Sequence, residues 1–154
     1  MKKLRGSQSV KSLCAGLLLI GAIASTCSAD LSGWIAFGSD RDGDYDIWAV
    51  RADGTGLTQL VNMPGSQLDP AWSPDSRKIA YTTENDTQVY VYDWASKTNT
   101  KIYDGDDYGG QHYLAGAAWS PDGNRILFHE ESSPGTHHIT VINADGTGRA
   151  VVPT

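Results

Sequence analysis

An eleven-residue block occurs twice in this chain, and its spacing constrains the fold more than any other feature. Residues 71–81 read AWSPDSRKIAY and residues 118–128 read AWSPDGNRILF, so equivalent positions lie 47 residues apart. That period is too long for one hairpin and is typical of a four-stranded blade of a β-propeller. Repeats of this kind bury their apolar faces only by stacking on one another. We therefore expect an all-β repeat protein.

Three kinds of strand recur around this block, each short and rich in β-branched and aromatic residues. The first kind comprises 34–37, 78–81 and 125–128, the second 46–50, 88–92 and 138–142, and the third 58–61, 100–103 and 150–152. An additional inner strand is indicated only around Trp72 and around Trp119. The pattern therefore predicts about three four-stranded blades, approximately 33–66, 67–110 and 111–154, of which the first is one strand short.

The first 29 residues have the layout of a secretory signal peptide. Basic residues at the start precede an uncharged, mostly apolar run over 13–24, and small residues follow up to Ala29. The apolar run is too short for a transmembrane anchor, so we do not expect an integral membrane protein. We predict cleavage after Ala29 and export to the periplasm or the exterior. A lipid anchor at Cys27 is a minor alternative.

Removal of residues 1–29 changes the charge balance and the cysteine content. Both cysteines and four basic residues leave with the leader, so 8 basic residues remain against all 18 acidic ones. Such a surface repels nucleic acid and favours a cation or a basic protein partner. Residues 30–154 suit one domain without disulfide or thiol chemistry.

The Trp-Ser-Pro-Asp motif, followed by a basic residue and a β-strand, resembles the WD-like repeat of TolB-type β-propellers. The segments SDRDGDYDIW at 39–48 and NADGTG at 143–148 strengthen the resemblance, which covers residues 33–154. It implies half of a six-bladed disc, and often a periplasmic protein-binding platform in an envelope complex. Such propellers host many tasks, so the motif indicates fold more specifically than function.

Three blades do not close a ring, because propellers typically have four to eight. An open end would expose sheet edges and apolar blade faces. Three arrangements remain open for the chain: a homodimer that completes a six-bladed propeller, completion by another chain, or a shortened relic of a longer gene.

Acidic residues are expected on one face of the disc, where strands two and three of each blade are joined and where one blade leads to the next. This face collects 12 of the 18 acidic residues: Asp40, Asp42, Asp44, Asp46, Asp69, Glu84, Asp86, Asp104, Asp106, Asp107, Glu130 and Glu131. The opposite face holds most basic residues, Arg149 among them. Solvated acidic loops that serve solubility explain this pattern as well as a binding face does.

Within the acidic face, the long connection 104–116 is the strongest candidate for recognition, because long loops on a rigid scaffold carry binding functions. The candidate partner-binding residues are Asp104, Asp106, Asp107, Tyr108, His112 and Tyr113. We expect no catalytic residue, cofactor or metal, since the sequence lacks a nucleophile elbow, a phosphate-binding loop and a zinc motif.

The sequence therefore favours an exported, non-catalytic propeller module that binds a protein partner in the bacterial envelope. The alternative is the remnant or half of a propeller enzyme that uses the acidic, histidine-bearing face. Gln111 and His112 are similar to the residue types with which propeller lyases of pectin fragments hold a divalent metal. The adjacent His137 and His138 argue against one shared ion, because neighbouring residues of a strand point to opposite faces.

Overall fold

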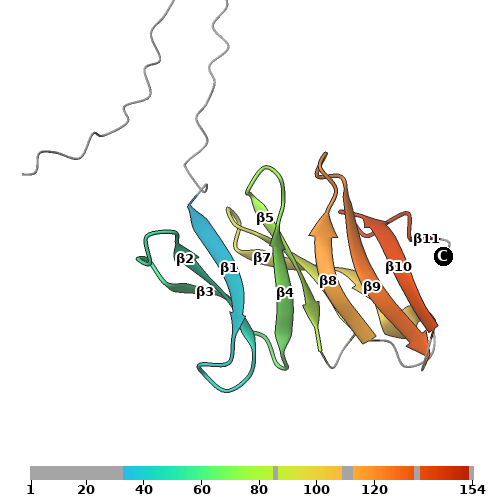
Figure 1. The fold of residues 1–154 in the computed structure, drawn as a ribbon, viewed down its shortest axis with the longest axis horizontal. Helices are drawn as coiled ribbons and strands as arrows, with labels where there is room; N and C mark the ends of the chain where they lie inside the picture. Colours follow the sequence, from blue (N-terminus) through green and yellow to red (C-terminus); the bar gives the residue numbers. More distant parts are fainter. Residues whose placement is uncertain (1–32, 85–86, 109–112, 134–135, 153–154) are drawn as a thin grey trace, which may run out of the picture.

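The computed structural model describes residues 33–84, 87–108, 113–133 and 136–152. They form three antiparallel sheets that follow one another along the chain (Figure 1). The first sheet contains β1 (Trp34–Ser39), β2 (Asp46–Arg51) and β3 (Thr58–Val61). The second contains β4 (Gln67–Trp72), β5 (Lys78–Thr83), β6 (Gln88–Asp93) and β7 (Thr98–Asp104). The third contains β8 (Tyr113–Trp119), β9 (Arg125–Ser133), β10 (Thr136–Asn143) and β11 (Ala150–Val152).

The strands of each sheet pair in sequence order, as in an up-and-down propeller blade. The only helical element among the described residues is the 3₁₀ turn η1 (Gly105–Tyr108), which follows β7. The prediction of an all-β partial propeller is confirmed, and the first sheet has three strands where the other two have four. The proposed signal peptide lies outside the described residues.

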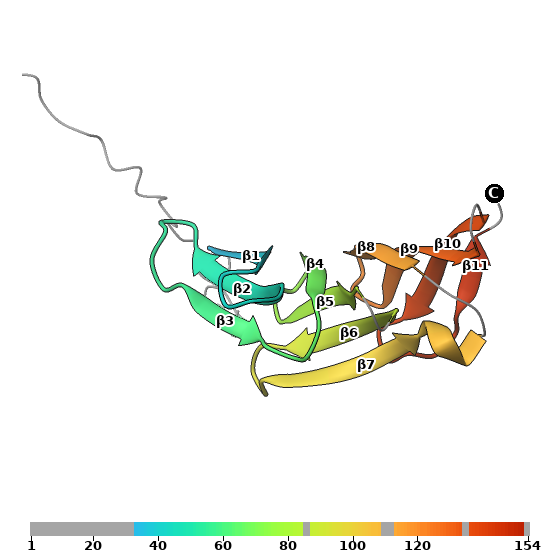
Figure 2. The same ribbon diagram turned by 90° about the horizontal axis from the view of Figure 1, so that it is seen from below.

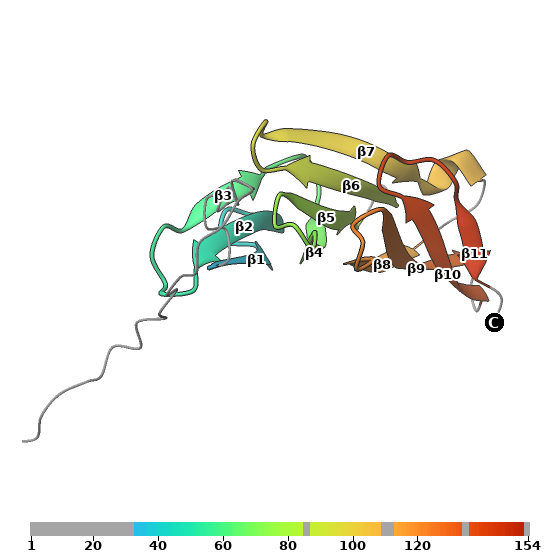
Figure 3. The same ribbon diagram turned by 90° about the horizontal axis from the view of Figure 1, so that it is seen from above.

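The sheets are stacked in a curved row, and the first strand of each sheet lies along the same side of that row (Figures 2 and 3). β1 contacts β4, and β4 in turn contacts β8. One apolar cluster joins the first sheet to the second through Ile47, Ile79 and Tyr81. Another joins the second sheet to the third through residues such as Val91 and Phe128. Sheet-on-sheet burial is therefore the source of stability, as the repeat predicts.

The duplicated block forms the same turn in both copies. Ser76 N–H donates to the Ser73 carbonyl, and Gly123 N–H donates to the Ser120 carbonyl, as in type I turns with proline at the second position. The fourth residue of each turn has a positive φ, 58° for Ser76 and 71° for Gly123. Lys97 takes a positive φ in the different turn between β6 and β7.

Asp46 does not lie in a solvated loop, contrary to the prediction from the sequence. It begins β2 and is only 1% exposed. Its Oδ2 accepts a hydrogen bond from Gln59, whereas Oδ1 is buried without a partner among the described residues. Burial raises the pKa of this carboxyl more than the Gln59 bond lowers it, and Asp44 and Asp42 raise it further. β2 begins at Asp46, as the predicted strand 46–50 does, so this carboxylate lies in the sheet and not on the acidic face.

No helix in the described part of the chain is both long enough and apolar enough to cross a membrane.

Candidate partner-binding site

The predicted recognition residues fall on the connection between β7 and β8. Asp104 ends β7, Asp106 and Asp107 lie exposed in η1, and Tyr108 closes η1. Tyr113 opens β8 with an exposed side chain. His112 lies outside the described residues, and the grouping of the other positions into one binding site stays a prediction.

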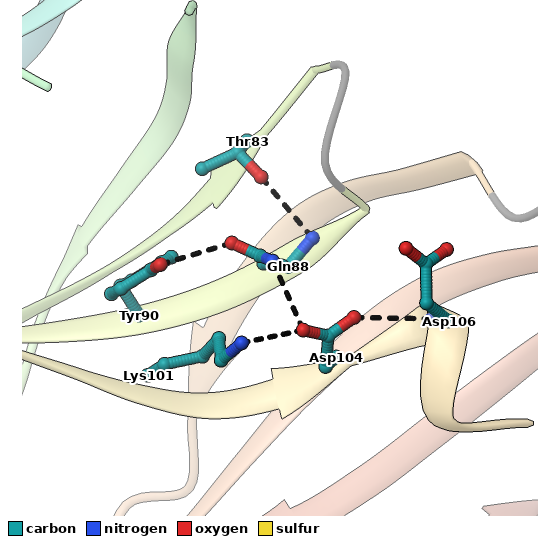
Figure 4. A network of polar contacts seen from close by, with 6 residues as sticks. All are labelled: Thr83, Gln88, Tyr90, Lys101, Asp104 and Asp106. Atoms are coloured by element: carbon teal, nitrogen blue, oxygen red, sulfur yellow. Dashed lines mark hydrogen bonds and ion pairs between the residues drawn. The ribbon is translucent and has the colours of Figure 1, made fainter. Parts of the chain in front are cut away.

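Asp104 anchors this connection to the second sheet (Figure 4). Its Oδ2 accepts a hydrogen bond of 3.0 Å from Gln88 Nε2 on β6 and forms an ion pair of 2.5 Å with Lys101 Nζ. Its Oδ1 accepts the backbone N–H of Asp106 at 3.1 Å, which caps the start of η1. The carboxylate is thus used inside the protein, and it fixes where η1 leaves the sheet.

The network extends along β6 through the side chain of Gln88. Gln88 Oε1 accepts a hydrogen bond from the Tyr90 hydroxyl, and Gln88 N–H donates to Thr83 Oγ1. The hydrogen bond from Lys101, with smaller contributions from the Asp106 N–H and Gln88, holds the pKa of Asp104 below its usual range. Asp104 is therefore ionised at neutral pH and already paired with a cation.

The residue before Asp104 anchors the same connection to the third sheet. The hydroxyl of Tyr103 donates to Glu130 Oε1 at 2.6 Å, and Thr140 Oγ1 donates to Glu130 Oε2 at 2.5 Å. Arg149, placed just before β11, donates to both carboxylate oxygens, at 3.2 and 3.0 Å. Neighbouring residues of β7 thus face opposite sides, and each is fixed by an ionic network.

Glu130 corrects a second prediction from the sequence, because its carboxylate is fully buried between two sheets and is not part of an acidic surface. Arg149, expected on the opposite face, is its partner. A signal for this was present: Ile126, Phe128 and Glu130 alternate along β9, which places all three on the inward side. We predicted an exposed position for Glu130 because it is charged, although the alternation along β9 indicates a buried one.

The histidines of β9 and β10 do not form a metal site with the described acidic residues. His129 and His137 stack with ring centroids 5.3 Å apart, and His137 Nδ1 lies 3.9 Å from Glu131 Oε2. His138 is paired with Glu130 in the strand register, and His137 with Glu131. Within the described ranges, no group of three or more His, Cys, Asp or Glu residues could hold a metal ion.

Exposed carboxylates and an exposed aromatic ring lie on the two sides of this connection. Asp106 and Asp107 present two adjacent exposed carboxylates, and Tyr113 presents an exposed aromatic ring on the neighbouring strand. Carboxylates of this kind form charge-assisted hydrogen bonds with Lys or Arg side chains. The anchors at Tyr103 and Asp104 fix the start of η1, which limits the conformational entropy that a contact with Asp106 and Asp107 would cost.

The stacked sheets define a protein class, the β-propellers, and comparison with known proteins defines the family. A model of the TolB beta propeller domain matches residues 22–154, so the chain belongs to the TolB β-propeller family. A protein TolB homolog of Chlorobaculum tepidum is 32% identical over 116 residues, which cover 73% of this chain and 25% of that protein. The crystal structure of TolB from Acinetobacter baumannii superposes with a TM-score of 0.63 and 24% identity, covering 82% of this chain and 32% of that one.

The same sheet stacking occurs in an enzyme. An oligogalacturonate lyase in complex with manganese superposes with a TM-score of 0.63 and 13% identity, over 77% of this chain and 36% of that one. At this identity the likeness shows the shared fold alone. The matches span about a third or less of the length of the curated relatives.

Proposed function

We propose that this chain is an exported, non-catalytic propeller module that binds a protein partner in the bacterial envelope. The observation that carries the proposal is the anchored start of the β7–β8 connection, where Tyr103 and Asp104 fix the point at which η1 leaves β7. Asp106 and Asp107 are exposed in η1, and Tyr113 is exposed at the start of β8. A rigid scaffold with exposed recognition residues on a connection is a common design of binding proteins.

The charge of the surface indicates what kind of partner fits. Lys101 forms its ion pair with Asp104, and Asp106 and Asp107 remain exposed in η1. The predicted mature chain is strongly acidic, and opposite charge both steers encounter and aligns two partners. The partner in this proposal therefore presents lysine or arginine side chains to η1. Membership of the TolB β-propeller family supports a binding role of this kind.

Carbodiimide cross-linking tests this contact directly, because the reagent joins a carboxylate to a nearby lysine amine only when the two touch. The exported protein would be treated in envelope extract of an expressing bacterium, and cross-linked peptides identified by mass spectrometry. We expect lysine-containing partner peptides joined to the segment that carries Asp106 and Asp107. The same spectra report whether the isolated chain begins at Asp30, as the signal peptide predicts.

A charge-matched control separates local contact from general electrostatics. Asp106→Asn with Asp107→Asn removes two negative charges from η1 and also the carboxylates that react with carbodiimide, so the readout for this variant is capture of the cross-linked partner by the immobilised protein, which should be lost. Ala95→Lys with Thr100→Lys changes the net charge equally, at exposed positions on the β6–β7 turn and on β7. The control should retain capture of the partner. Equal loss in both variants would contradict a specific site on η1.

A further inference from the structure

At the first sheet, the row ends in a face that no other sheet of the described residues covers; only the Arg41 guanidinium lies over it, 5.6 Å from the centre of the Phe37 ring. Ile35 of β1 is 53% exposed, although it occupies the repeat position of Ile79 in β5 and Ile126 in β9, which are both 0% exposed. Those two are covered because each packs on the preceding sheet. Phe37 lies two residues further on the same face of β1. We call this surface, carried by Ile35 and Phe37, the first-sheet face.

A second uncovered face lies at the other end of the row. Leu127 of β9 is 38% exposed, although its repeat equivalent in β5, Ala80, is 0% exposed beneath the third sheet. Leu127 stands opposite Ala118 of β8 and Val141 of β10 in the strand register. We call this surface, carried by Leu127 and Val141, the last-sheet face.

The last-sheet face is hollowed as well as apolar. A cavity of about 300 Å³ is lined by Ala118, Trp119, Ser120, Arg125, Ile126, Leu127 and Val141. An apolar depression on a sheet face is the kind of surface that protein contacts bury. Its size suits aromatic or branched side chains from a second sheet rather than a polar ligand.

The chain itself shows what packs on such a face. In both internal contacts, an isoleucine and an aromatic ring two residues later meet the preceding sheet: Ile79 with Tyr81, and Ile126 with Phe128. The first-sheet face carries the same pair of side-chain types, Ile35 with Phe37. One chain therefore has the inserting surface at one end and the receiving surface at the other.

We propose that the last-sheet face binds the first-sheet face of a second copy of this chain. Two such contacts, related by a two-fold axis, join three sheets to three sheets in a closed ring of six. Six lies within the range of four to eight blades found in propellers. Closure matters, because a head-to-tail contact that does not close produces open-ended filaments.

The molar mass of the protein in solution, measured by size exclusion with light scattering on protein isolated from cells expressing the full sequence, tests the proposal. The expected value is twice that of one chain. Ile35→Asp and Leu127→Lys should each halve the molar mass. The dimer has two identical contacts, so either change places a charge in each of them. Leu57→Asp, at a 48% exposed position between β2 and β3, should leave it unchanged.

Mixing the two face variants gives a sharper readout. A pair made of one Ile35→Asp chain and one Leu127→Lys chain keeps one unaltered contact, and its other contact joins a carboxylate to an ammonium group. The mixture should return to twice the single-chain mass, which simple destabilisation would not produce. A single-chain mass of the unaltered protein, or a ladder of larger assemblies, overturns the proposal even where a variant fails to fold. A mixture of folded variants that stays at single-chain mass also overturns it.

Discussion

Glu130 of β9 and Arg149, just before β11, form an ion pair of 3.0 Å between Oε2 and Nη2. The carboxylate is fully buried and the arginine side chain is 24% exposed. Because Tyr103 and Thr140 donate to the same carboxylate, one group ties together β7, β9, β10 and the approach to β11. The end of β7, from which η1 leaves the sheet, is therefore held by a polar network that lies between two sheets.

Glu130→Gln should lower the free energy of unfolding by about 3 kcal/mol, because it leaves a partly buried arginine without its counter-charge. Urea denaturation measures the change. Glu131→Gln is the matched control: the adjacent carboxylate is 30% exposed and faces the other side of the strand. Its effect should stay below about 0.5 kcal/mol. An equal decrease in the free energy of unfolding for the two variants would contradict a stabilising role of the buried network.

The same network predicts how stability depends on pH. Burial by itself would raise the pKa of Glu130, but hydrogen bonds from Thr140, Tyr103 and Arg149 and the charge of Arg149 hold it below its usual range. A carboxyl whose pKa is lowered by folding contributes stability above its unfolded pKa of about 4.3. That contribution is lost as the pH falls through the folded pKa. The stability gap between wild type and Glu130→Gln should therefore narrow below about pH 4, and a gap that stays constant would contradict the assignment.

Asp46 should show the opposite sign. Folding raises the pKa of this buried carboxyl, so its charge disfavours the folded state once the pH exceeds the unfolded pKa. Asp46→Asn keeps the acceptor for Gln59 and removes that charge. We expect the melting temperature at pH 7 to rise by a few degrees, with the gain disappearing at acidic pH. A melting temperature that falls at pH 7 would show that the charge is compensated.

Trp72 and Trp119 occupy the same repeat position but differ in one hydrogen bond. Trp119 Nε1 donates to the Ala71 carbonyl at 3.0 Å, which links β8 to β4. Trp72 Nε1 is buried and has no acceptor in the described part of the chain. Replacement by phenylalanine should cost about 1 kcal/mol more at Trp119 than at Trp72, since only the former loses a bond. Thermal denaturation compares the two variants directly. Equal losses of stability would show that the hydrogen bond from Trp119 does not contribute.

The repeat predicted the strands well because each strand kind recurs with the same alternation. The segments 78–81 and 125–128 form parts of β5 and β9, and the first sheet lacks an inner strand as expected. Burial of charged residues was harder to predict. The sequence places Glu130 two residues after Phe128, yet only the structure shows that Arg149 reaches it from another strand. A long-range ion pair leaves no trace in local periodicity.

The most direct test of the proposed function exchanges the β7–β8 connection for its counterpart between the first two sheets. Residues 105–112 would be replaced by residues 62–66, which join β3 to β4. Circular dichroism confirms that the graft folds, and capture of the partner identified by cross-linking measures binding without requiring a carboxylate in the segment. We expect a folded protein that no longer captures the partner. A folded graft that captures the partner as strongly as the unaltered protein would contradict the proposed site.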